Sequence, residues 1–159
     1  RPLIGGGGQE SGLRAGTENI SYIAGMCLAL EIADNDSEMN NNFVQKLENY
    51  FFEKLKKSKI DYRINGETRI PGIINVTFFD IDGHALLMNL DMMNIAISYG
   101  SACSSGSTSA PLALLEIGMH KKEAESSVRI SFGKMINQNN IDYLVSCLTQ
   151  IILRLKNEK

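Results

Sequence analysis

Apolar residues recur at helical spacing in three long stretches of the chain. They predict helices over residues 19–33, 43–57 and 141–155. The polar segment 34–42 is predicted to separate the first two helices. The third helix has the strongest apolar stripe, formed by Ile141, Leu144, Val145, Leu148, Ile151, Ile152 and Leu155.

Shorter apolar runs fill the middle of the chain and predict strands. The predicted strands are residues 62–65, 73–79, 94–97 and 128–132. In the last strand the alternation turns Val128 and Ile130 toward a core, so that Arg129 faces the other way. Asp82 is placed to cap a further helix that runs through Leu86 to Met93.

The change from long helices to short elements divides the chain near residue 58. We predict that residues 59–159 form an α+β domain, with a small, largely antiparallel sheet and helices packed on one face. Residues 1–58, a glycine-rich entry and two helices, are predicted to bridge this domain to a larger one. The start at Arg1, without methionine and before four glycines, indicates a piece of a longer protein.

Composition narrows the class of protein. The 159 residues are 43% hydrophobic and 21% charged, which is typical of a globular protein. A net charge of −2 favours neither nucleic acid nor an anionic membrane as a partner, and no spanning segment is predicted. Three widely spaced cysteines favour the reducing cytoplasm, with Cys27 and Cys147 expected in the core. The His and Cys spacings predict no metal site.

Cys103 lies in an uncharged run of small residues, Ser98 to Pro111. Such a run cannot bury apolar surface, so a solvated loop is predicted between two packed elements. A thiol is unusual there, because cysteine is usually buried, and its position favours a reactive role over an incidental surface cysteine. The loop itself holds no Lys, Arg or His, so a group elsewhere would have to activate the thiol.

Two further segments are candidates for binding anions. Thr17 follows the glycine-rich segment and precedes a helix, where a hydroxyl and unsatisfied N–H groups can bind a phosphate. The alternative is an ordinary linker and helix cap. Arg129 can offer a planar fork to a carboxylate, and the alternative is a surface arginine in a salt bridge.

Taken together, these segments resemble the pyridoxal-phosphate-dependent cysteine desulfurases of the NifS/IscS-like group, within the class V aminotransferase family. Residues 6–19, GGGQESGLRAGTEN, are similar to the family's GGGQExGxRxGTxN segment. Residues 100–107, GSACSSGS, resemble its GSACxSG loop, and residues 126–133, SSVRISFG, resemble its SS(I/V)RxSxG strand.

The resemblance implies a role for each matching residue. Cys103 matches the nucleophile that takes sulfur from L-cysteine, becoming a persulfide and leaving L-alanine. Arg129 matches the arginine that binds the substrate carboxylate. Thr17 matches the threonine that reaches the pyridoxal phosphate of the other subunit in a homodimer. The implied fold is the C-terminal small domain of a fold-type I enzyme, with residues 1–58 as the tail of its large pyridoxal-phosphate-binding domain. The implied acceptors are iron–sulfur scaffold or tRNA-thiolation proteins.

The sequence departs from the family's pattern at two places. Ala110-Pro111-Leu112 stands where the family often has an EPS-type run, and Gly83-His84 replaces Gly-Glu. The family's cofactor lysine belongs upstream of the segments matched here, so this piece alone is expected to be inactive and to bind no cofactor covalently. A selenocysteine-lyase-like relative and a stand-alone persulfide carrier or interaction module are the alternatives.

Overall fold

The computed structural model describes residues 1–100 and 110–157. By its internal packing the chain divides into two compact units, Arg1–Glu38 and Met39–Lys159. The predicted boundary near residue 58 concerns a larger protein, and it stays a prediction.

The first unit folds its glycine-rich entry into a closed turn. Leu3 N–H donates to Leu13 O (2.8 Å) and Ala15 N–H donates to Ile4 O (3.2 Å), with the short helix η1 (Glu10–Gly12) between them. Gly6 and Ala15 approach closely, because a Cβ at Gly6 would lie 2.9 Å from Ala15 Cβ. A glycine is therefore required where the two arms of this turn meet.

One helix, α1 (Ile20–Lys57), replaces the two helices and the intervening break that the sequence pattern predicts. The prediction of a break at residues 34–42 is wrong. That segment is polar but holds no glycine or proline, so nothing in it interrupts the backbone hydrogen bonds. Asn19 caps the helix, since its Oδ1 accepts from Tyr22 N–H at 3.2 Å.

The second unit contains a three-stranded antiparallel sheet in the order β1-β2-β3. Its strands are β1 (Tyr62–Asn65), β2 (Ile73–Phe78) and β3 (Ser127–Ser131). The predicted strand at 94–97 is wrong. Asn94 has a left-handed φ of 58° at the end of a turn. Only Ser98, the first residue after the predicted strand, forms a bridge to β3.

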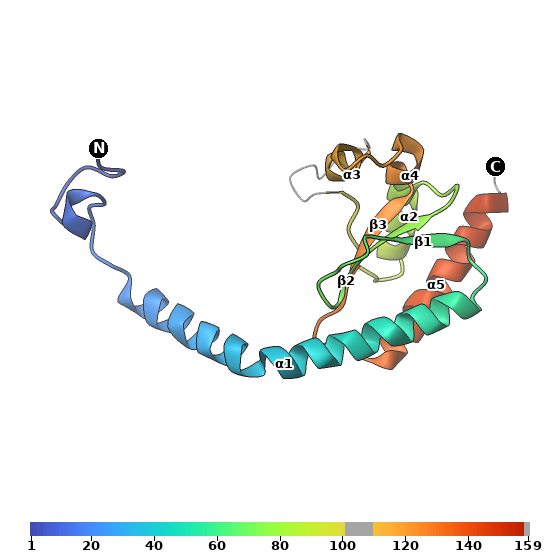
Figure 1. Ribbon diagram of the computed structural model, residues 1–159, viewed down its shortest axis with the longest axis horizontal. Coiled ribbons are helices and arrows are strands. Elements are labelled where there is room, and N and C mark those ends of the chain that lie inside the picture. The colour runs from blue at the N-terminus through green and yellow to red at the C-terminus, as the bar shows by residue number, and fades with distance from the viewer. Residues whose placement is uncertain (101–109, 158–159) are drawn as a thin grey trace. The chain divides into compact units, whose positions relative to one another are not determined.

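Besides the end of α1, the described residues of this unit form the helices α2 (Gly83–Asp91), α3 (Leu112–Glu116), α4 (Lys121–Glu125) and α5 (Gln138–Asn157). The core forms on one face of the sheet, against α2, α5 and the part of α1 that belongs to this unit (Figure 1). Its fully buried side chains include Phe51, Leu55, Ile74, Val76, Phe78, Leu86, Leu90, Val128 and Leu148. The predicted α+β architecture is therefore confirmed.

Asp82 caps α2 as predicted, because its Oδ1 accepts from the N–H groups of His84 (2.8 Å) and Ala85 (3.1 Å). Cys147 is buried as predicted, but Cys27 is exposed. The prediction for Cys27 is wrong because apolar residues on the same part of α1 are themselves exposed, among them Ile23, Met26 and Leu30. An apolar pattern identifies a helical face without showing what covers it.

Candidate functional site

Arg129 lies on β3 and faces away from the core, as the alternation predicts. Its neighbours Val128 and Ile130 are buried, whereas Arg129 is exposed. The reason is the period of two in a strand, which sends alternate side chains to opposite faces. The sheet therefore presents a guanidinium on its polar face.

This polar face is ordered by side-chain hydrogen bonds. Asn65 Nδ2 donates to Asn75 Oδ1 (2.6 Å) and to Thr77 Oγ1 (2.8 Å). The Thr77 and Ser127 hydroxyls lie 2.8 Å apart, and Ser127 Oγ donates to the Glu123 carbonyl of α4 at 2.7 Å. Buried hydroxyls that are satisfied in this way fix the positions of neighbouring side chains on the three strands.

The backbone of Arg129 is held from the side opposite β2 by Ser98. Ser98 N–H donates to Arg129 O (2.9 Å), and Arg129 N–H donates to Ser98 O (2.8 Å). The guanidinium also bonds this residue, because Arg129 Nη2 donates to Ser98 Oγ at 3.2 Å. The segment that leads into the cysteine motif therefore lies directly beside the arginine motif.

Arg129 has no carboxylate partner within 4.0 Å among residues 1–100 and 110–157. Arg63 and Arg69 of the same unit differ, because they pair with Glu123 (2.7 Å) and Glu48 (3.2 Å). The alternative interpretation of Arg129, a surface arginine in a salt bridge, thus finds no support in this part of the chain. An arginine fork without an internal carboxylate can bind an external one.

Thr17 lies in the first unit, exposed, three residues before α1 begins at Ile20. The first turn of α1 contains no acidic residue. Glu18, the nearest carboxylate in sequence, is paired with Arg14 at 3.3 Å, which offsets its repulsion of an anion. Asn19, rather than Thr17, provides the helix cap, so the hydroxyl of Thr17 is not used for capping.

Cys103 falls within residues 101–109 and so lies outside the described residues. Among the predicted site residues, Arg129 and the start of the cysteine segment are brought together through Ser98. Thr17 belongs to the other unit. No group of three or more His, Cys, Asp or Glu side chains able to hold a metal ion occurs in the described ranges.

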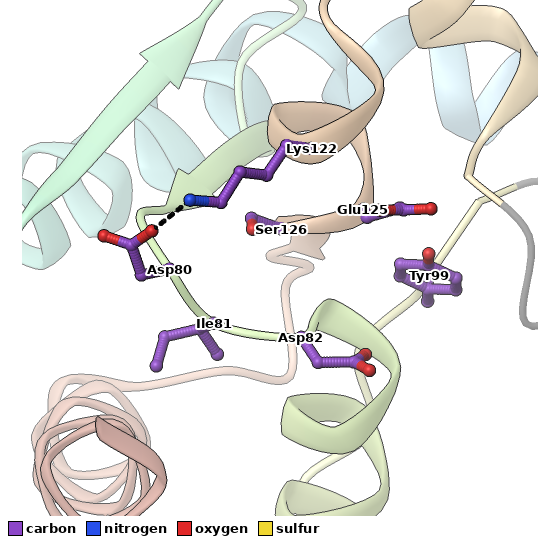
Figure 2. A pocket seen from close by; sticks show the side chains of 7 residues that line it. All are labelled: Asp80, Ile81, Asp82, Tyr99, Lys122, Glu125 and Ser126. Atoms are coloured by element: carbon purple, nitrogen blue, oxygen red, sulfur yellow. Dashed lines mark hydrogen bonds and ion pairs between the residues drawn. The ribbon is translucent and has the colours of Figure 1, made fainter. Parts of the chain in front are cut away.

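A cavity of about 280 Å³ lies beside Tyr99, between the start of α2 and the end of α4. Figure 2 shows its lining, which includes the carboxylates of Asp82 and Glu125, and the ion pair of Lys122 with Asp80 at 2.6 Å. Burial, and then the charges of Asp82 and Glu125, raise the pKa of the Tyr99 phenol above its usual value. Because the phenol stays protonated, it can act as a hydrogen-bond donor.

Sequence reasoning missed both Ser98 and this cavity. Ser98 is one of several serines in a low-complexity run, and only its bridge to Arg129 sets it apart. The cavity gathers residues that are far apart in the sequence, from Asp80 to Ser126. No local pattern signals such a juxtaposition.

A family model described as "Aminotransferase class-V" matches residues 5–144. The chain therefore belongs to the class-V aminotransferase family, as the motifs indicate. The match extends through the glycine-rich turn of the first unit and the sheet of the second. Within the described residues, no helix is long and apolar enough to cross a membrane.

Among curated relatives, the chain is 37% identical over 155 residues to "Cysteine desulfurase IscS" of Buchnera aphidicola. It is 35% identical over 156 residues to "Cysteine desulfurase" of Homo sapiens. Each alignment covers 97% of this chain, but only 38% and 34% of the respective relatives. The chain thus spans less than two fifths of these relatives.

Solved structures of NifS-like proteins share the fold. The NifS-like protein from Rickettsia africae superposes with a TM-score of 0.78 at 32% identity, over 95% of this chain and 39% of that one. A second structure titled "NIFS-LIKE PROTEIN" gives a TM-score of 0.80 at 29% identity, over 98% and 39% of the two chains. The shared fold includes the sheet that carries Arg129.

Proposed function

We propose that this chain is the C-terminal part of a cysteine desulfurase, which removes sulfur from L-cysteine and leaves L-alanine. The observation that carries the proposal is the pairing of Ser98 with Arg129. This pairing puts the segment that leads to Cys103 beside an exposed arginine that has no carboxylate partner in the described part of the chain. The relatives named cysteine desulfurase, which match nearly the whole chain, support the same reaction.

In this proposal Arg129 binds the carboxylate of the amino acid. A guanidinium can donate two parallel N–H···O bonds to a carboxylate, which fixes the orientation of the substrate as well as its position. Cys103 then acts as the nucleophile toward the substrate sulfur. The thiolate attacks that sulfur and an S–S bond forms as the C–S bond breaks, so that the sulfur remains on Cys103 as a persulfide. The electron pair of the C–S bond stays with the substrate carbon, which takes up a proton on the way to L-alanine.

Pyridoxal phosphate is the cofactor that the family implies, and when bound it supplies an electron sink at the substrate carbon. Thr17 suits a phosphate chemically. Its hydroxyl stands just before a helix whose first turn lacks acidic residues, and Glu18 is already paired. We propose that Thr17 donates to the phosphate of the opposite subunit in a homodimer.

We further propose that the persulfide is passed to a sulfur-acceptor protein, such as an iron–sulfur scaffold, in the cytoplasm. The three cysteines at wide spacing suit a reducing compartment, where a persulfide can be handed on as a transient species. Neither a nucleic acid nor a membrane is proposed as a direct partner.

The test replaces Cys103 with alanine in the full-length protein. We expect Cys103→Ala to abolish the release of L-alanine from L-cysteine while leaving cofactor content unchanged, because the thiol acts after the substrate has bound. Cys27→Ala is the matched control and should retain activity, since Cys27 is exposed and matches no catalytic motif. Turnover by Cys103→Ala close to that of the parent protein would overturn the proposed role.

A further inference from the structure

The bond between Ser98 and Arg129 uses side chains as well as backbone. Both backbone groups of Arg129 bond Ser98, so on its other side Arg129 forms a non-hydrogen-bonded pair with its β2 partner, Asn75. Side chains lie closest in pairs of that kind. The stem of Arg129 therefore has an ordered neighbour on each side, and Asn75 is itself held by Asn65 (2.6 Å).

Only one contact in the described part of the chain fixes the head of the Arg129 side chain. Nη2 donates to Ser98 Oγ at 3.2 Å, and this bond occupies one of five guanidinium N–H donors. The remaining donors include those needed for a two-point contact with a carboxylate. An arginine has several rotatable side-chain bonds, so a contact that fixes its head before a ligand arrives reduces the entropy lost on binding.

From this geometry we infer that Ser98 is a positioning residue, whose hydroxyl orients the Arg129 guanidinium to receive the carboxylate of an amino acid. The inference rests on the proposed function, in which Arg129 binds that carboxylate. Ser98 touches no reacting atom in this account. It acts only through Arg129, and its effect is therefore expected on affinity rather than on the chemical step.

The contacts allow the side chain of Ser98 to be tested apart from its backbone. Ser98→Ala removes the Oγ acceptor but keeps the two backbone hydrogen bonds to Arg129, because these use N–H and C=O groups. Ser98→Thr keeps the hydroxyl. Ser146 provides a matched control, since it is an exposed serine on α5 and takes no part in the polar face of the sheet described above.

The experiment uses the full-length protein and two ligands, L-alanine and ethylamine, which differ by the carboxylate. Calorimetric titration gives the dissociation constant of each, and steady-state kinetics give KM and kcat for L-cysteine. We expect Ser98→Ala to weaken L-alanine binding and raise KM about fivefold, the size of one modest hydrogen bond. We expect kcat and the affinity for ethylamine to stay within about twofold, as for Ser146→Ala.

Ser98→Thr should restore the affinity for L-alanine to within about twofold of the parent protein. Equal weakening of both ligands, or no rescue by threonine, would overturn the inference, because it would show a general structural role. Arg129→Lys distinguishes a failure of the positioning role of Ser98 from a failure of the carboxylate role of Arg129. If Arg129→Lys weakens L-alanine and Ser98→Ala does not, the positioning role is wrong and the proposed function stands. If neither weakens L-alanine, the carboxylate role of Arg129 is wrong.

Discussion

Arg129 shows how the surroundings of a strand residue leave its side chain available for the role that we propose for it. The alternation of β3 turns it away from the core, and none of the described carboxylates neutralises it. A salt bridge at this position would have made it a structural residue. The guanidinium N–H groups of Arg129 are thus available to a ligand because the described neighbouring side chains offer no carboxylate.

At this scale we predict that Arg129→Lys costs more than a swap of like charges suggests. An ammonium group cannot reproduce the two-point contact of a guanidinium, so about 2–3 kcal/mol of transition-state stabilisation should be lost. The measurement is kcat/KM for L-cysteine in the full-length protein. A change of less than about threefold would place Arg129 outside the substrate site.

Among the elements, the start of α2 depends on a glycine for its packing. Gly83 is buried, and a Cβ there would lie 2.8 Å from the Glu125 carbonyl oxygen and 2.9 Å from Tyr99 Cε2. Such distances are too short for ordinary contacts. The end of α4 and the segment beside the cysteine motif therefore approach α2 only because residue 83 lacks a side chain.

We predict that Gly83→Ala lowers the free energy of unfolding of this chain by about 1–3 kcal/mol through overpacking. Gly133→Ala is the control, because a Cβ at Gly133 meets nothing within 4 Å. Urea unfolding monitored by circular dichroism gives both values. Equal midpoints for the two variants would show that Tyr99 and Glu125 move aside without cost.

The elements also show what sequence patterns can predict. Strands β1, β2 and β3 and the Asp82 cap follow from local signals, namely alternation and a side-chain acceptor at a helix start. Residues 94–97 alternate in the same way but form no strand. Their apolar side chains Ile95 and Ile97 pack against the core without a ladder of backbone hydrogen bonds. The alternation of apolar and polar residues predicts which side chains are buried. Whether a segment pairs as a strand depends on backbone partners elsewhere in the chain.

Of the candidate site, the motif residues could be predicted but their surroundings could not. The position of Arg129 on the polar face follows from its strand. Its contact with Ser98 depends on tertiary structure that joins residues 31 positions apart. The polar run 34–42 illustrates the converse, since polarity alone does not end a helix that lacks glycine and proline.

For the whole molecule, the proposed function requires more than this chain. The chain spans 38% of its Buchnera relative, and the proposed cofactor contact of Thr17 crosses between subunits. Thr17→Val should weaken pyridoxal phosphate binding by about tenfold or more in the full-length protein, because it removes one hydrogen bond to a charged group while keeping the shape of the side chain.

Mixed dimers test whether that contact crosses between subunits. One chain carries Thr17→Val and the other lacks the upstream cofactor lysine that the family uses. In the mixed dimer, the one site that keeps its lysine receives threonine from the other chain, so native cofactor affinity should return at that site. Affinity that stays at the Thr17→Val level would contradict a contact in trans.

The most direct test of Cys103 as the sulfur acceptor is the mass of the peptide that contains it, measured after the full-length protein is incubated with L-cysteine. We predict a gain of one sulfur atom, about 32 Da, on Cys103 and no gain on Cys27 or Cys147. Both cysteines serve as internal controls. Cys147 is buried in the core, and Cys27 lies outside all three family motifs. A persulfide on either of them, or none on Cys103 during turnover, would contradict the account.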